Sequence, residues 1–477
     1  MHPVRVVVRH ELAQAFASRR FWTLFVSSSL LVAVAVAQGA LRFRAQRDEH
    51  RRLEALARAE WLAQGPKTPH VGHHFGQWVM RPPPPLSALE RGEQDYLGQR
   101  LVLDAHNKGA PVASTAEEDP LAAVTGAFDL GFVVAVLLPL LVVFSAHDAV
   151  SGEKERGTLR MTLSQPISRA TFLTGKLLGQ LVLFLLAFGL PLIVLALGAL
   201  AAAGALGPGE LIEVGGILAA ALLYTAFFLL VTLWASAATH RPGAALGLGF
   251  ATWLLVVFLI PRGAVFVAEQ VHPVRAPLAL LPEQGRIRRQ VEEERGPRFQ
   301  ALVKRLREQY PELPESLGRG GAGGHEPAQE GWRVDPAGAF ASEGNALLNR
   351  ARAEAIASVR GPYERQDALA RRLSGASPAA LFSRAAMSMA CTDVENHRHF
   401  EAQVGRFFDE QEHFFNALWA RNVRSFSDWA SVSTFSYAAE PLTARLARFG
   451  QGMAGLAAFF LLALAGAALQ LRRYDPR

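Results

Sequence analysis

Residues 177–203 read LLGQLVLFLLAFGLPLIVLALGALAAA and contain no Asp, Glu, Lys or Arg. At about 1.5 Å of rise per residue, a helix of this stretch exceeds the roughly 30 Å of hydrocarbon in a bilayer. Asp129, in a first turn, is the only Asp, Glu, Lys or Arg in the five further apolar runs, which are 21–41, 128–146, 214–238, 244–260 and 453–471. The sequence therefore predicts an all-α membrane protein with six transmembrane helices, and a wholly soluble fold is excluded.

Two polar segments, 42–127 and 263–452, lie between these runs and are too long to be simple connections. Strong helix formers follow the first run, so we expect its helix to continue out of the membrane until Gly65 and Pro66 stop it. Four consecutive prolines at 82–85 predict a stiff extended spacer. Because apolar residues recur at helical spacing in the larger segment, we expect two extracytoplasmic, mainly helical insertions.

Lys and Arg in the short connections indicate the orientation of the spans. The loop 204–213 has none and would lie outside. The flanks that would lie inside carry thirteen: Arg5, Arg9, Arg19, Arg20, Lys154, Arg156, Arg160, Arg169, Lys176, Arg241, Arg472, Arg473 and Arg477. Five arginines at 42–52 argue the other way, but long segments cross largely regardless of charge. We expect a multi-pass protein of a bacterial inner membrane with both termini cytoplasmic.

Under this orientation residues 1–20 would form an interfacial amphipathic helix and residues 472–477 a cytoplasmic tail. The net charge of +7 comes mainly from the membrane flanks, and no basic patch with interleaved aromatic residues is present. We therefore expect the lipid bilayer, and no nucleic acid, as a partner. The single cysteine, Cys391, excludes an intrachain disulfide and is expected to be a small buried apolar residue.

The loop between the second and third runs is the best functional candidate in the chain. Residues 147–179 read HDAVSGEKERGTLRMTLSQPISRATFLTGKLLG, far longer and more charged than a connection needs. Its charged residues, Glu153, Lys154, Glu155 and Arg156, offer partners to another protein. Gly157 permits a tight turn, Thr158 is expected to cap the helix that Leu159 continues, and Pro166 would end that helix. Ser168 would cap the next helix, and Lys176 would anchor the third span at the membrane interface.

These residues resemble the permease subunits of type-2 ABC exporters, in the branch with a large extracytoplasmic insertion before the last span. The resemblance rests on a charged motif and a second, downstream motif, comprising Glu153, Glu155, Gly157, Thr158, Leu159, Pro166, Ile167, Ser168, Arg169, Gly175 and Lys176. It implies that the loop 147–176 is cytoplasmic and contains a coupling helix around 152–163, which docks on a dimer of separate ABC ATPase subunits. ATP and Mg would be bound by that partner.

The chain has no phosphate-binding loop, so we expect no cofactor and no enzymatic activity in it. The resemblance also implies a second permease half, either another copy or a relative. Gly243, Gly247 and Gly249 fit a dimer seam or pathway as well as they fit ordinary helix packing. Asp129 has either a substrate or ion role or is an interfacial carboxylate in contact with water.

Three histidines, His70, His73 and His74, have a spacing that could share a metal ion. No acidic or cysteine ligand adjoins them, so we expect no metal site there.

Three functions are compatible with the sequence. The first is the permease of an ATP-driven exporter, whose insertions shape the exit or recruit a periplasmic partner. The second is a permease that passes ATP-driven motion to such a partner without moving a solute. The third is a membrane receptor or scaffold outside the ABC class.

Overall fold

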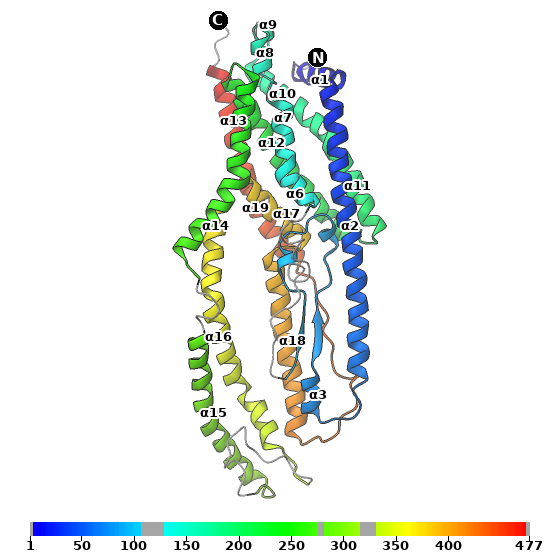
Figure 1. Ribbon diagram of the computed structural model, residues 1–477, viewed down its shortest axis with the longest axis vertical. Helices are drawn as coiled ribbons and strands as arrows, with labels where there is room; N and C mark the ends of the chain where they lie inside the picture. The colour runs from blue at the N-terminus through cyan, green and yellow to red at the C-terminus, as the bar shows by residue number, and fades with distance from the viewer. Residues whose placement is uncertain (1–2, 106–127, 275–280, 315–330, 474–477) are drawn as a thin grey trace.

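The computed structural model describes residues 3–105, 128–274, 281–314 and 331–473, which form an elongated molecule of long helices (Figure 1). The described residues include six helical segments that are long and apolar enough to cross a membrane, namely Arg19–Leu62, Leu130–Glu155, Arg169–Ala202, Pro208–Ala238, Pro242–Val271 and Leu442–Arg473. The predicted all-α, six-span membrane fold is confirmed. The first and last described residues lie at the same end of the molecule, which we call the terminal end; the other is the far end.

The membrane segments are single helices or helices joined by short π-helical turns. They comprise α2 (Arg19–Leu62); α6 (Leu130–Phe132), η3 (Val133–Leu137), α7 (Leu138–Ala146) and α8 (Ser151–Glu155); α10 (Arg169–Phe184), η4 (Leu185–Gly189) and α11 (Leu190–Ala202); α12 (Pro208–Ala238); α13 (Pro242–Leu254), η5 (Leu255–Leu259) and α14 (Ile260–Val271); and α19 (Leu442–Arg473). At the terminal end, α1 (Pro3–Ala17) precedes α2, and α9 (Thr158–Leu163) follows α8.

Each π-helical turn ends two residues before a proline: Pro139, Pro191 or Pro261. Proline has no N–H and cannot bond the carbonyl one turn before it, so a backbone acceptor is freed inside the bundle. Another element supplies a donor to each turn. Ser28 Oγ donates to the carbonyl of Ala187 at 2.9 Å. The corresponding bonds join Tyr224 Oη to Ala135 at 2.8 Å and Ser377 Oγ to Val256 at 2.6 Å.

The first insertion contains a small antiparallel hairpin, so it is not helical throughout. β1 (Gln77–Met80) pairs with β2 (Arg100–Leu103), and α3 (Pro69–Phe75) precedes them. Pro85 opens the short helix η1 (Pro85–Ala88), and η2 (Gln94–Tyr96) follows. Leu86 and Leu89 are almost fully buried in the same core as the spans. Residues 82–84 lie outside helices and strands, and Pro84 is extended, as predicted. The prolines are not only a spacer, because they lead into a segment that packs in the core of the span bundle.

The larger insertion is built mainly from α15 (Leu281–Gln309), α16 (Pro336–Ser374), α17 (Pro378–Ala390) and α18 (Val394–Ala420). Helix α17 packs on α12 and α19, and its Phe382 ring stacks on Tyr224 with centroids 5.1 Å apart. This short helix therefore enters the span bundle. The whole segment 263–452 was predicted to lie outside the membrane. Helix α17 is the part of it that packs among the spans instead.

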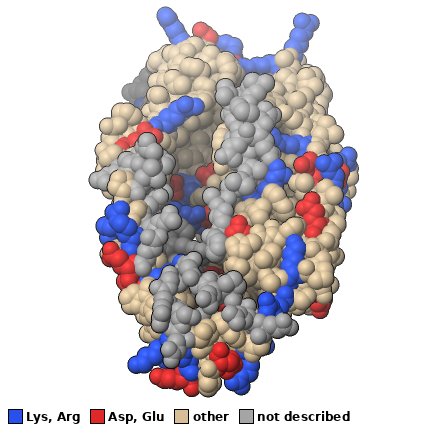
Figure 2. All heavy atoms as spheres, turned by 60° about the horizontal axis from the view of Figure 1, so that its bottom comes forward, with Lys and Arg blue, Asp and Glu red and all other residues tan. Residues whose placement is uncertain are grey.

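At the far end, small apolar clusters join α2, the hairpin and α18. In one of these clusters Trp61 packs on Phe415 and Trp429. Figure 2 brings this end forward and shows acidic and basic side chains interspersed over the visible face. That mixture does not form a surface for polyanions.

Candidate functional site: the segment between the second and third spans

Helices α8 and α9 project at the terminal end of the molecule (Figure 1). Gly157 separates them in a left-handed conformation with φ of 74°, which glycine adopts without a steric penalty. Thr158 is the first residue of α9 and not its cap, because its hydroxyl donates to the Glu153 carbonyl at 3.3 Å. Pro166 lies beyond the end of α9, and Ser168 caps α10 by accepting from the Thr171 N–H.

A buried ionic triad ties this segment to α1 and α10. Lys176 is 3% exposed, and its Nζ donates to Glu11 Oε1 at 2.7 Å and also to Glu153. Gln180 donates to the second oxygen of Glu11 at 3.0 Å. Lys176 is therefore not an interface anchor, and Glu153 points inward where an outward-facing partner site was predicted. Removing one member of such a buried set typically costs about 3–5 kcal/mol, because a charge is left unpaired.

Two glycines of α10 allow α1 to approach closely enough for these bonds. A Cβ on Gly175 would lie 2.5 Å from Val7, and one on Gly179 would lie 2.8 Å from the side chain of Glu11. The predicted N-terminal helix is thus packed on the third span through its apolar residues and one buried carboxylate.

The first span is joined to the segment through Arg20. Its guanidinium donates to Asp148 Oδ2 at 3.0 Å and lies 3.1 Å from Nδ1 of His147. Both partners are partly exposed, so this contact contributes little stability by itself. Its value lies in geometry, because it fixes the start of α2 next to the turn that precedes α8.

The fourth span is joined through the Ser236 hydroxyl, which is fully buried. This oxygen accepts from the N–H groups of Val150 and Ser151 at 3.0 and 2.9 Å and donates to the His147 carbonyl at 2.7 Å. Lys154 donates to the carbonyls of Ala237 and Thr239 at the end of the same helix. Two predicted site residues, Glu153 and Lys154, therefore bind the segment to other helices of the same chain and do not face outward.

The last span is joined through Arg169, whose Nη1 donates to the carbonyls of Leu471 and Arg472, each at 2.7 Å. Leu159 is fully buried and anchors α9. The outward surface is made by Glu155, Arg156, Gly157, Thr158 and Met161, the last with 71% of its surface exposed.

The span glycines divide into two groups. Gly249 packs against Val143 of the second span, where a Cβ would come within 2.8 Å, while Gly243 and Gly247 have open space beside them. Gly249 therefore serves packing within the chain.

Asp129 is 4% exposed and caps α6, accepting from the N–H groups of Phe132 at 2.8 Å and Arg91 at 2.9 Å. The alternative that Asp129 is a carboxylate in contact with water is wrong, because the segment that follows the prolines covers its side chain.

The three neighbouring histidines lie against aromatic rings at the far end. His70 stacks on Trp419 and His73 on Phe415, with ring centroids 3.9 and 4.8 Å apart. Within the described ranges no group of three or more His, Cys, Asp or Glu side chains is arranged to hold a metal ion. Burial raises the pKa of the Cys391 thiol to about 12, so the thiolate is scarce at neutral pH.

Several residues that join the site were not predicted from the sequence. Glu11, Arg20 and Ser236 come from three different helices, and their roles depend on distances across the bundle. A buried acidic residue on an otherwise apolar helical face, as at Glu11, is the one signal that sequence inspection could have used.

Six apolar spans, a helical fold and a projecting segment fixed to the spans are the features of a multi-pass membrane protein. A family model described as "ABC-2 family transporter protein" matches residues 5–291, more than half of the chain, and the chain therefore belongs to that family. A second model, a domain of unknown function (DUF3526), matches residues 283–438.

The chain is also similar to a protein of Pseudomonas aeruginosa described as a probable ABC transporter permease protein, NosY. The two are 30% identical over 139 residues, which cover 28% of this chain and 50% of that protein. The chain thus spans about half the length of this relative. The resemblance seen in the sequence is confirmed at the level of the family: the chain belongs to the ABC-2 transporters and is similar to a probable ABC transporter permease.

Proposed function

We propose that this permease is driven by a dimer of separate ABC ATPase subunits and works in export. The ATPase would dock on the exposed tip formed by Glu155, Thr158 and Met161, on the cytoplasmic face of a bacterial inner membrane, while the neighbouring Arg156 lines a cavity. A second permease half, another copy or a relative, would complete the assembly. ATP and Mg would belong to the partner chains.

The observation that carries this proposal is the set of bonds that fixes the segment to the rest of the chain. Lys176, Arg20, Ser236 and Arg169 connect it to four different spans. A push on the tip would therefore be delivered to several helix ends at once, because none of these contacts can shift without moving its helix. A loose connecting loop would absorb the same push.

Docking can be tested with two variants on the tip, Glu155→Ala and Met161→Asp. We expect each to weaken co-purification with the ATPase, Met161→Asp by about tenfold, because a charge would be placed in a contact that excludes water. Met161→Leu keeps the apolar surface and is the matched control. Unchanged association and unchanged ATP turnover in Met161→Asp would place the docking surface elsewhere.

A second candidate function is supported by α2, which is one helix of 44 residues. It begins beside the Arg20–Asp148 contact, and its last turn contains Trp61, which packs between far-end aromatic rings. Such a rod could transmit motion to a periplasmic partner without solute transport. Membership of the ABC-2 family argues against the third alternative, a receptor or scaffold outside the ABC class.

A further inference from the structure

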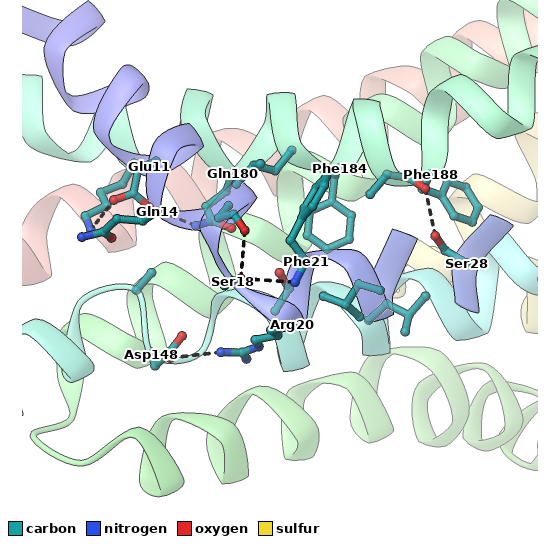
Figure 3. A pocket seen from close by; sticks show the side chains of 18 of the residues that line it. Glu11, Gln14, Ser18, Arg20, Phe21, Ser28, Asp148, Gln180, Phe184 and Phe188 are labelled. Carbon is teal, nitrogen blue, oxygen red and sulfur yellow. Dashed lines mark hydrogen bonds and ion pairs between the residues drawn. The ribbon is translucent and has the colours of Figure 1, made fainter. Parts of the chain in front are cut away.

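A cavity of about 240 Å³ lies at the terminal end, between α1, α2, α10 and the segment from α7 to α8 (Figure 3). Its wall changes character along its length. Figure 3 shows Glu11, Gln14, Arg20 and Asp148 toward one side and Phe184 and Phe188 toward the other. Leu24, Leu141 and Leu183 also line the cavity and add apolar surface to its wall. A cavity of this kind suits an amphiphile whose polar end lies near the membrane surface.

The charged residues of the wall are mostly neutralised by one another. Lys176 is paired with Glu11 and with one oxygen of Glu153, and Arg20 is paired with Asp148. The other oxygen of Glu153, Oε2, is buried and has no hydrogen-bond partner among the described residues. An unmet carboxylate oxygen in a partly enclosed site is costly unless a donor reaches it.

Arg156 supplies the opposite charge. It lines the cavity and is exposed, and its guanidinium takes part in no ion pair or hydrogen bond within the part of the chain that the structure describes. The wall therefore offers one unpaired guanidinium, of Arg156, and one unpaired carboxylate oxygen, of Glu153. Glu153 lies in α8, and Arg156 is the residue that follows the last residue of that helix. A ligand with an anionic group and an N–H donor would satisfy both.

We propose that this cavity binds the headgroup of a phospholipid with a primary amine, of the phosphatidylethanolamine type, from the leaflet next to the termini. The phosphate would be held by Arg156, since guanidinium and phosphate form paired charge-assisted hydrogen bonds. The ammonium would donate to Glu153 Oε2, which a trimethylated amine cannot do. The volume is below that of pockets that enclose a drug-sized ligand, so the acyl chains would stay in the bilayer.

The apolar half of the wall favours a lipid over a free phosphoamine, because a soluble ligand would leave that surface uncovered. The inference depends on the membrane placement of the spans and not on an ATPase partner. Its failure can therefore be told apart from a failure of the proposed coupling.

The test is native mass spectrometry of the full-length permease, purified in mild detergent and exchanged against equal amounts of three lipids. We expect retention of phosphatidylethanolamine over phosphatidylcholine and phosphatidylglycerol. Arg156→Gln should lower that retention about tenfold. Arg160→Gln is the matched control, because Arg160 is exposed on the same segment and does not line the cavity. Ser145→Phe would fill the cavity without removing a charge and should have the same effect as Arg156→Gln.

Equal retention of the three lipids would overturn the proposal, as would unchanged retention in both Arg156→Gln and Ser145→Phe. Competition by free phosphoethanolamine as effective as that of the lipid would overturn the assignment to a lipid. Loss of retention in the two variants alone, with Arg160→Gln like the wild type, would support it.

Discussion

Glu90 lies in the segment that closes the far side of the span bundle, and its side chain faces Gly131 and Val134 of the second span. Only 8% of the residue is exposed, and Oε1 accepts one hydrogen bond, from the Gly92 N–H at 3.1 Å. Burial raises the pKa of the Glu90 carboxyl well above its ordinary value, and the nearby charge of Asp129 raises it further. The neutral Glu90 carboxyl therefore persists to a higher pH in the folded protein than in the unfolded chain.

Replacing Glu90 with Gln should stabilise the protein increasingly as the pH rises. A raised folded-state pKa means that the unfolded chain ionises first, so the wild type loses stability from the ordinary Glu pKa of about 4.3 upward, until the folded pKa is passed. Glu90→Gln avoids this loss and keeps an acceptor for Gly92. We expect its melting temperature to exceed that of the wild type by several degrees more at pH 8 than at pH 5, measured by intrinsic fluorescence in detergent.

Glu60→Gln, at an exposed position on α2, is the matched control and should show no such pH-dependent difference. A Glu90→Gln variant less stable than the wild type by the same amount at both pH values would contradict the argument, because it would indicate lost packing and no ionisation effect.

At the level of single elements, three hydrogen bonds between helices are accepted by carbonyls in the π-helical turns that come before the prolines. Backbone groups in a bilayer have no water to bond, so a freed carbonyl needs a donor from a neighbouring helix. Ser28, Tyr224 and Ser377 meet that need on three different elements. Pro139, Pro191 and Pro261 thereby connect helices to one another while they distort their own.

The neighbouring serines of α2 allow a matched test of this role. Ser28 donates across the bundle to Ala187, whereas Ser27 donates only to Leu24 of its own helix. We expect Ser28→Ala to lower the free energy of unfolding by about 1 kcal/mol, as is typical of side-chain hydrogen bonds between membrane helices. Ser27→Ala should cost less than half as much. The measurement is denaturant unfolding in mixed micelles, and equal costs for the two variants would contradict the assigned role.

For the whole molecule, the central question is whether motion at the terminal end reaches the far end. Helix α2 spans about 66 Å if it is straight, given its 44 residues. Its last turn is fixed by Trp61, whose indole N–H donates to the Trp429 carbonyl at 3.0 Å, and by edge contacts with Trp429 and Phe415. Replacing a buried Trp with Ala typically lowers the free energy of unfolding by about 3–5 kcal/mol. We therefore expect this change to loosen the contact between the end of α2 and the far-end aromatic residues.

If α2 transmits motion, Trp61→Ala should abolish an ATP-dependent distance change between labels at positions 60 and 410, on α2 and α18, while association with the ATPase is retained. Pulsed electron resonance on cysteine-attached labels measures this distance, and the raised pKa of Cys391 keeps the native thiol out of the reaction. Trp78→Ala, at a tryptophan that is 44% exposed, is the matched control. A distance change that survives in Trp61→Ala, together with ATP-dependent solute flux, would favour export over mechanical transmission.

Much of the fold could be predicted because it depends on composition along the chain. The six apolar runs predicted the spans, and the helix formers after the first run predicted the continuous helix α2. Gly157 was predicted to turn the backbone, and its left-handed conformation agrees. Bulk hydropathy and local backbone preference need no knowledge of neighbours in space.

Partnerships between distant residues could not be predicted in this way. Glu153 and Lys176 are both charged residues in a membrane flank, where exposure is the ordinary expectation, yet they form one buried set with Glu11. Helix α17 is too short to register as a span and enters the bundle only because Ser377 and Phe382 find partners there. The sequence by itself determined that the chain crosses a membrane six times, since the transfer of apolar residues into lipid is a property of each segment alone. Only the tertiary structure decided which polar groups are paired and which are left free, because a buried charge is stabilised or penalised by atoms that lie far away in the sequence.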